Sequence, residues 1–139
     1  MEKIINILLV EDDQLDIIDI KRELDKIHLL YNVHVAHNGE EALEMLSPTV
    51  PGNEPLKPDV TLIDINMPKM NGMEFLQALR SDDVLKNMKC FMMTTSSDPE
   101  DMEEAKKLGI SGYIVKPFKS NTANIDAFNL MIDLMNMKQ

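Results

Sequence analysis

Near its start the chain reads Leu8-Leu9-Val10-Glu11-Asp12-Asp13, an apolar run that ends in three acids. Parallel strands that are buried on both faces read as continuous apolar runs of this kind. Three later runs also end in a chemically reactive side chain: they are Leu62–Asp64, Phe91–Thr94 and Tyr113–Lys116. Because an open α/β sheet gathers its reactive groups at the carboxyl ends of its strands, we expect acids, a hydroxyl and an amine to meet in one crevice.

The hydrophobic period switches repeatedly between that of a strand and that of a helix, which is typical of βαβ units. We expect strands over Ile5–Val10, Val33–Ala36, Val60–Ile63, Cys90–Met93 and Gly112–Val115, each followed by an amphipathic helix. The sequence therefore predicts an α/β fold, with a doubly wound five-stranded parallel sheet of order 2-1-3-4-5.

Capping residues mark the ends of several helices. Asn38, with Glu41 three residues later, resembles a capping box that opens the second helix. Asp98-Pro99 supplies a cap and a first-turn proline for the fourth helix, and Gly109 ends that helix. The fifth helix is predicted from apolar residues that share one side: Ile125, Phe128, Ile132 and Met135.

Length and composition fit a single domain spanning residues 1–139. The net charge of −10 argues against nonspecific binding to nucleic acid or to an anionic membrane. No stretch approaches the roughly 18 apolar residues of a membrane span. A lone Cys90 cannot form an internal disulfide and fits a reducing compartment, so we expect a cytoplasmic protein.

Glu11, Asp12 and Asp64 are expected to lie close together, because strands one and three are neighbours where the strand order reverses. Like charges about 4 Å apart repel by roughly 1 kcal/mol in water and about 4 kcal/mol at an effective dielectric of 20. Mg²⁺ suits such a set of oxygen ligands. Thr94 and Lys116 are placed to hold phosphoryl oxygens, which predicts a phosphorylation site.

These residues, in this order and at this spacing, resemble the receiver domain of two-component response regulators, and the likeness runs from the first strand to the last helix. Glu11 and Asp12 match the acidic pair of that family, and Asp64 matches its phospho-accepting aspartate. Thr94 matches the switch hydroxyl and Tyr113 the switch aromatic. The resemblance implies a flavodoxin-like fold of the kind found in CheY.

The resemblance also implies a metal site. Asp12, Asp64 and the backbone carbonyl of Asn66 would be direct Mg²⁺ ligands, and Glu11 would act through water. Asp13 is instead expected to cap the first helix. These assignments make the acids a magnesium site that prepares Asp64 for phosphorylation.

A further segment, Lys116-Pro117-Phe118, matches the Lys-Pro segment of the family. Lys116 would pair with one phosphoryl oxygen while Thr94 donates a hydrogen bond to another. By resemblance, the Lys116–Pro117 peptide bond would be cis and would aim the lysine inward.

The chain is accordingly expected to be a stand-alone regulator without an output domain. It would accept a phosphoryl group on Asp64 from a histidine kinase or a phosphotransfer protein, and assist its own phosphorylation and dephosphorylation without being an enzyme for other substrates. The face of the fourth helix, fifth strand and fifth helix would then bind an output protein, or the phosphoryl group would pass onward in a relay. The same face leaves room for a homodimer.

Other function classes fit the residues less well. A haloacid-dehalogenase-type phosphatase needs a second acid two positions after its nucleophile, where this chain has Asn66. An EF-hand that starts at Asp64 requires glycine where Lys69 stands. A receiver-like module that binds partners without phosphorylation is the remaining alternative, although such modules usually lose an acid or the lysine.

Residues 47–58 form an unusually long connection between the second helix and the third strand. Four prolines predict a stiff surface loop rather than a helix. It resembles the longer loop of small regulators that are paired with phytochrome-type sensor kinases. A tolerated insertion without a role is the alternative.

Overall fold

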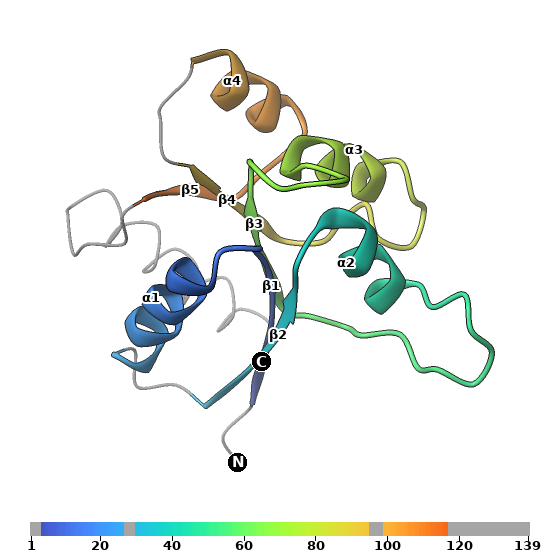
Figure 1. Ribbon diagram of the computed structural model, residues 1–139. Coiled ribbons are helices and arrows are strands. Elements are labelled where there is room, and N and C mark those ends of the chain that lie inside the picture. The colour runs from blue at the N-terminus through green and yellow to red at the C-terminus, as the bar shows by residue number, and fades with distance from the viewer. Residues whose placement is uncertain (1–3, 27–29, 95–98, 117–139) are drawn as a thin grey trace.

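The computed structural model describes residues 4–26, 30–94 and 99–116. Figure 1 shows strands and helices that alternate along the chain. The described strands are β1 (Ile5–Val10), β2 (Tyr31–Ala36), β3 (Val60–Asp64), β4 (Cys90–Thr94) and β5 (Gly112–Val115). The described helices are α1 (Gln14–Asp25), α2 (Gly39–Leu46), α3 (Gly72–Arg80) and α4 (Pro99–Lys107). The predicted fifth helix, the cap at Asp98 and the Lys116–Pro117 bond lie outside the described residues.

All five strands belong to one parallel sheet of order β2-β1-β3-β4-β5, which confirms the predicted topology. Strand β1 pairs with both β2 and β3, so the strand order reverses on either side of it. The predicted bounds of β1 and β5 are correct. Strand β2 begins two residues before the predicted Val33, because Tyr31 and Asn32 pair with Ile5 and Asn6 of β1.

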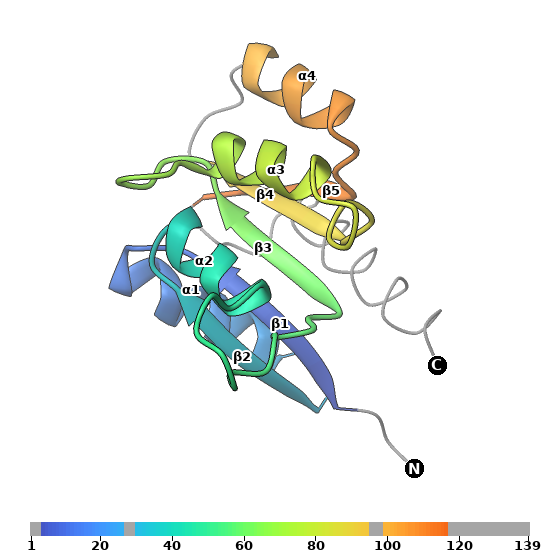
Figure 2. The same cartoon turned by 90° about the vertical axis from the view of Figure 1, so that its right-hand side faces the viewer.

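Helices cover both faces of the sheet (Figures 1 and 2). Helix α1 packs its buried Ile17, Ile20 and Leu24 against one face. Helices α2, α3 and α4 cover the other face, with Ala42, Leu76 and Ala105 among their buried residues. Both faces of β1 and β3 are buried, as their apolar runs predict. No helix in the described part of the chain is long and apolar enough to cross a membrane.

Side-chain caps fix where the helices begin. Asp13 caps α1 by accepting hydrogen bonds from the backbone N–H groups of Leu15 and Asp16, as expected. Asn38 caps α2 by accepting from the N–H of Glu41.

The reciprocal capping box predicted for α2 is found on α3 instead, where Asn71 and Glu74 each bond to the backbone of the other. The carboxylate of Glu41 faces Nδ1 of His37 at 3.2 Å. The sequence pattern therefore located the cap of α2 correctly but not the partner of Glu41.

Helix α3 lies very close to the end of β3. A Cβ atom at Gly72 would stand 2.2 Å from the backbone oxygen of Asp64 and 2.8 Å from Cα of Ile65. The N–H of Gly72 donates to the carbonyl of Ile65 at 2.9 Å. Glycine at this position thus lets the helix approach the strand end that carries Asp64.

Candidate functional site

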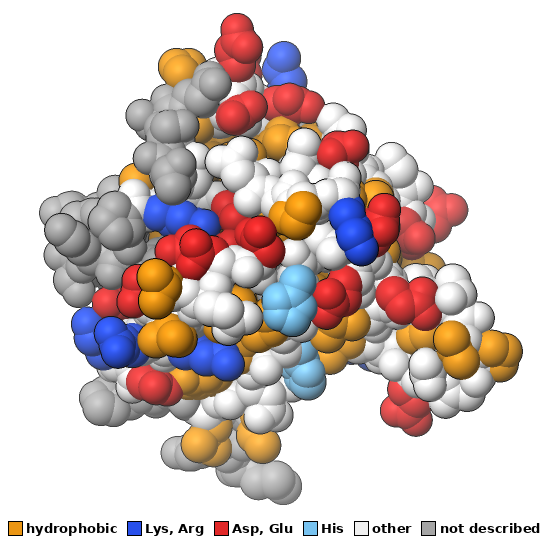
Figure 3. Space-filling model, in the orientation of Figure 1, with side chains coloured by type: hydrophobic (Ala, Val, Ile, Leu, Met, Phe, Trp, Pro, Cys, Tyr) orange, Lys and Arg blue, Asp and Glu red, His pale blue; other side chains and the backbone are white. Residues whose placement is uncertain are grey.

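The reactive residues follow strands that are neighbours in the sheet. In the register of β1 and β3, Val10 pairs with Ile63, so Glu11 and Asp64 leave the sheet side by side. Thr94 ends β4 and Lys116 follows β5. Figure 3 shows acidic side chains gathered near the middle of this face, over the ends of β1 and β3 and beside a basic group. The acids and the amine therefore meet at this end of the sheet, as predicted.

Three carboxylates cluster at this end of the sheet. Ligand oxygens of Glu11, Asp12 and Asp64 lie within 4.8 Å of one another. Glu11 and Asp64 are buried, whereas Asp12 is exposed. Among the described residues, no other group of three or more histidine, cysteine or acidic side chains gathers in this way. The cluster consists of hard oxygen donors and is open to solvent on the side of Asp12.

The ammonium of Lys116 is the counter-charge of the cluster. Its Nζ atom lies 2.6 Å from Oε1 of Glu11, 2.8 Å from Oδ2 of Asp16 and 3.3 Å from Oδ1 of Asp64. One lysine therefore bridges three carboxylates, with its side chain only 7% exposed. Sequence reasoning missed Asp16. It occupies the first turn of α1, where an acid normally serves only to stabilise the helix N-terminus.

Backbone N–H groups hold two of the carboxylates in place. Oε2 of Glu11 accepts from the N–H groups of Asp12 at 3.1 Å and Asp13 at 3.4 Å. Oδ1 of Asp64 accepts from the N–H of Asn66 at 3.3 Å. The Asn66 residue itself is exposed beside Asp64. These contacts hold the carboxylates of Glu11 and Asp64 in the cluster.

Burial and crowding change the proton affinity of the site. Burial, together with the adjacent Asp64, raises the pKa of Glu11 to about 8, although Lys116 opposes the shift. Burial alone would lower the pKa of Lys116, but its hydrogen bonds to Asp16 and Glu11 and the charge of Asp64 raise it above the usual value. Lys116 therefore stays charged at neutral pH. Glu11 tends to hold a proton there, and a bound cation would displace that proton.

Thr94 ends β4, and Tyr113 lies on the adjacent strand β5, opposite Met92. Thr94 is 5% exposed, and its backbone carbonyl accepts from the N–H of Lys116 at 2.7 Å, which joins β4 to the residue after β5. The hydroxyl of Tyr113 donates to the backbone carbonyl of Met102 on α4. Burial and the charge of Asp101 raise the pKa of Tyr113. Tyr113 thus connects β5 to α4.

The family model for the response regulator receiver domain matches residues 7–125. This chain belongs to that family. Receiver domains are signalling domains that bind Mg²⁺ at an acidic cluster and interact with histidine kinases and output domains. The oxygen-rich cluster of Glu11, Asp12 and Asp64 stands where such a cluster is expected.

Individual relatives agree with this assignment. A two-component response regulator from Legionella pneumophila superposes with a TM-score of 0.79 at 34% identity, over 96% of this chain and 99% of that one. The bacteriophytochrome response regulator RtBRR gives a TM-score of 0.78 at 32% identity, over 95% of this chain and 78% of that one. The chemotaxis protein CheY of Pseudomonas aeruginosa is 38% identical over 87 residues, which are 63% of this chain and 64% of CheY.

Several curated relatives are longer than this chain. The match covers 25% of the regulatory protein AtoC of Escherichia coli and 43% of the transcriptional regulatory protein CpxR. The chain therefore spans a quarter to about two thirds of the length of the curated relatives compared here. What the chain shares with these proteins is the receiver domain.

Proposed function

We propose that this receiver is a Mg²⁺-dependent phosphoacceptor switch in which Asp64 takes a phosphoryl group from a histidine kinase or a phosphotransfer protein. The observation that carries the proposal is the position of Lys116, whose ammonium lies 3.3 Å from Asp64 within the acid cluster. A buried cation beside a carboxylate is a ready-made site for the oxygens of an anion. The family to which this chain belongs acts in phosphorelay signalling.

In the proposed reaction, a carboxylate oxygen of Asp64 attacks phosphorus. A new P–O bond forms while the P–N bond of the donor phosphohistidine breaks, and the imidazole leaves as the neutral base after taking up a proton. Phosphoryl transfer depends mainly on positioning and charge neutralisation, so no general base is required. Two features position Asp64: the N–H of Asn66 and the close packing of Gly72 against its backbone.

The donor set fits a magnesium ion. Four carboxylates, those of Glu11, Asp12, Asp16 and Asp64, lie around a single ammonium, so the site keeps an excess of negative charge that a divalent cation would neutralise. Asp12, Asp64 and the backbone carbonyl of Asn66 would hold the ion directly, with Glu11 behind them. When bound, the ion supplies positive charge that stabilises the phosphoryl oxygens.

Lys116 and Thr94 would hold the transferred group. Lys116 would exchange one of its carboxylate partners for a phosphoryl oxygen, and the hydroxyl of Thr94 would donate to another oxygen. Tyr113 would respond to the movement of Thr94, because the two residues lie on paired strands. Helix α4 would follow, since Tyr113 is hydrogen-bonded to Met102.

The output of this switch would be a change in protein binding at the face that includes α4 and β5. That face would serve an output protein or a second copy of the chain, unless the phosphoryl group is passed on to another histidine. A relay shuttle should return phosphate quickly to a histidine partner. An output switch should instead bind its target more tightly when phosphorylated, typically by about 5- to 150-fold.

The deciding experiment is intact-protein mass spectrometry after incubation with acetyl phosphate, with and without Mg²⁺. We expect a gain of one phosphoryl group, about 80 Da, that requires Mg²⁺ and is absent from Asp64→Asn. Asp59→Asn is a suitable control, because Asp59 precedes β3 at its other end and binds the backbone of Asn6. Absence of the gain in the unmodified sequence would contradict the proposal and favour a module that binds partners without phosphorylation.

A further inference from the structure

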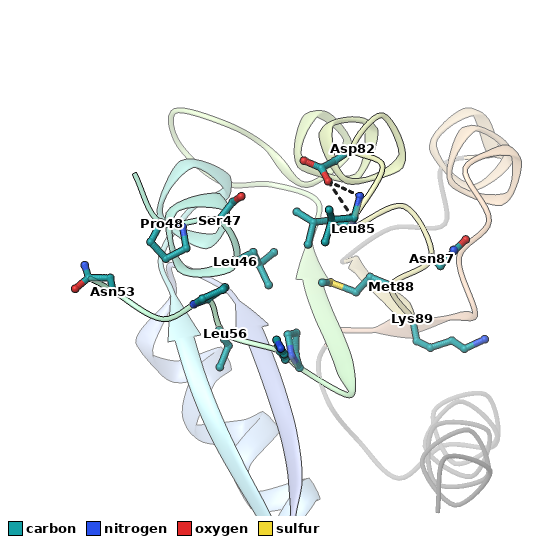
Figure 4. Close-up of a pocket in the computed structure, with 14 residues that line it drawn as sticks. Leu46, Ser47, Pro48, Asn53, Leu56, Asp82, Leu85, Asn87, Met88 and Lys89 are labelled. Atoms are coloured by element: carbon teal, nitrogen blue, oxygen red, sulfur yellow. Dashed lines mark hydrogen bonds between the residues drawn. The ribbon is translucent and has the colours of Figure 1, made fainter. Parts of the chain in front are cut away.

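The Pro-rich segment 47–58 forms one wall of a groove at the amino end of the sheet. The opposite wall is the connection between α3 and β4, which we call the 81–89 connection after its residues. Figure 4 shows Leu85 and Met88 of that connection facing Leu46 and Leu56 across the hollow. The hollow has a volume of about 620 Å³ and further apolar lining from Pro48, Pro55 and Pro58.

A second hollow, of about 350 Å³, lies on the other side of the 81–89 connection. Four cations line it, and no acidic residue does: Arg80, Lys86, Lys89 and Lys107. Asn87, Met88 and Lys89 line both hollows and form a ridge between them. Figure 4 shows Lys89 pointing away from the apolar side of this ridge. An apolar groove and a basic hollow thus adjoin each other.

Among the residues that the structure describes, no acid lines the basic hollow itself, although Lys107 also borders a separate hollow lined by Glu100, Glu103 and Glu104. Within the described part of the chain, Lys89 and Lys107 have no carboxylate within ion-pair distance, and Lys86 has only the fully exposed Asp83 at 3.8 Å. The guanidinium of Arg80 donates its hydrogen bonds to backbone carbonyls rather than to a carboxylate. In a chain with net charge −10, such a group of cations is a local exception that attracts negative ligands.

Both walls are held in place by hydrogen bonds. Arg80 donates to the carbonyls of Lys86 and Met88, each at 2.9 Å, and so fixes the ridge. On the other wall, the N–H of Leu56 donates to the carbonyl of Met45 at 2.8 Å, and Thr49 donates to the carboxylate of Glu44. A preformed surface loses little conformational entropy when a partner binds.

We infer that this groove and the basic hollow together form a docking surface for an acidic peptide segment of a partner protein that also carries apolar side chains. Its apolar residues would enter the groove, and its carboxylates would face Lys89 and Lys107. A peptide suits the shape because a ligand that reaches both hollows must cross the ridge. Val84, which is 88% exposed beside the groove, would be covered by the same segment.

This surface is separate from the phosphorylation site. The groove lies at the end of the sheet where β3 and β4 begin, whereas Asp64 and Thr94 lie at the opposite end, where these strands finish. Five strand residues span about 16 Å. A partner could therefore dock here while the phosphoryl group is transferred at the opposite end of the sheet. The inference does not depend on the proposed function.

The test is selection from a phage-displayed library of random short peptides on the intact protein. The enriched peptides are then tested for binding to the double variant Lys89→Glu/Lys107→Glu, and Lys21→Glu, on the exposed side of α1, is the matched charge control. We expect enriched peptides rich in Asp, Glu and apolar residues. Their affinity should fall about fivefold or more in the double variant and stay unchanged in Lys21→Glu.

Amide chemical shifts then locate the binding site. An enriched peptide should perturb the amides of residues 82–89, Leu56 and Lys57 equally in the unmodified protein and in Asp64→Asn. Val84→Ser should weaken the binding of that peptide. Peptides that are basic, that bind the double variant equally well, or that leave these amides unchanged would overturn the inference. Binding of the small apolar anion anilinonaphthalene sulfonate at these amides without any enriched peptide would also overturn it, in favour of a small-molecule site.

Discussion

The ammonium of Lys116 lies 2.8 Å from a carboxylate oxygen of Asp16, although the two residues are 100 positions apart in the chain. Asp16 thereby forms an ion pair with the same ammonium that neutralises Glu11 and Asp64. An incoming phosphoryl group needs this cation as well. Asp16 is therefore expected to restrain the reaction by holding Lys116 in the resting arrangement.

Replacement of Asp16 by asparagine should speed phosphorylation by acetyl phosphate. The change removes one negative charge near an anionic donor and frees Lys116, so we expect roughly a fivefold increase, equivalent to about 1 kcal/mol. The time course of intact-protein mass measures this rate. Asp19→Asn, in the same helix and 3.9 Å from the exposed Arg22, is the matched control. A slower reaction in Asp16→Asn would mean that Asp16 positions Lys116 productively.

Stability without divalent cations should depend on the protonation of Glu11. Its pKa rises from 4.5 to about 8 on folding, so the folded protein keeps a proton that the unfolded chain releases. This contribution to stability is complete below pH 4.5 and is lost as the pH rises through about 8. The free energy of unfolding should fall over that window, by at most about 1.4 kcal/mol per pH unit.

Urea denaturation at a series of pH values measures this dependence. Glu11→Gln should flatten the curve, whereas Glu54→Gln, an exposed residue of the 47–58 loop, should leave it unchanged. Added Mg²⁺ should also flatten it by displacing the proton. An equal slope in Glu11→Gln and the unmodified protein would assign the pH dependence to other groups.

Gly72→Ala should both destabilise the protein and impair phosphorylation. The new Cβ would stand 2.2 Å from the backbone oxygen of Asp64, so α3 and the end of β3 must separate. We expect a loss of about 3 kcal/mol in the free energy of unfolding, together with slower acetyl phosphate labelling at temperatures where the variant is folded.

The control is Gly52→Ala. Gly52 has a positive φ of 94° but open space around its Cβ position, so this variant should lose roughly 1–2 kcal/mol through backbone strain alone. Its labelling rate should match that of the unmodified protein. Equal labelling by both variants would show that the contact between Gly72 and Asp64 does not position the acceptor.

Thr94→Ala should uncouple Tyr113 from phosphorylation. The chain has only two tyrosines, so selective ¹³C labelling reports Tyr113 with Tyr31 as an internal reference. Phosphorylation of the unmodified protein should shift the ring signals of Tyr113 and leave those of Tyr31 in place. In Thr94→Ala, Asp64 should still be labelled while the Tyr113 signals stay unshifted. A full Tyr113 shift in this variant would rule out the route through Thr94.

Local pattern was sufficient to predict most of the fold. The bounds of β1 and β5, the strand order and the cap at Asp13 were predicted correctly, because buried strands and helix caps are encoded by neighbouring residues. The meeting of Glu11, Asp12 and Asp64 followed from topology alone, since strands that are adjacent in a parallel sheet bring their carboxyl ends together.

Contacts between distant segments were decided by the tertiary structure. Strand β2 begins at Tyr31 because β1 offers backbone partners there, which no periodicity in the polar Tyr31-Asn32 pair indicates. The ion pair between Asp16 and Lys116 requires α1 to pack beside the end of β5. The groove between residues 47–58 and the 81–89 connection depends on long-range packing, in which Arg80 holds the 81–89 connection through the carbonyls of Lys86 and Met88. Sequence specifies which residues are buried or capped, but long-range pairs depend on how the elements pack.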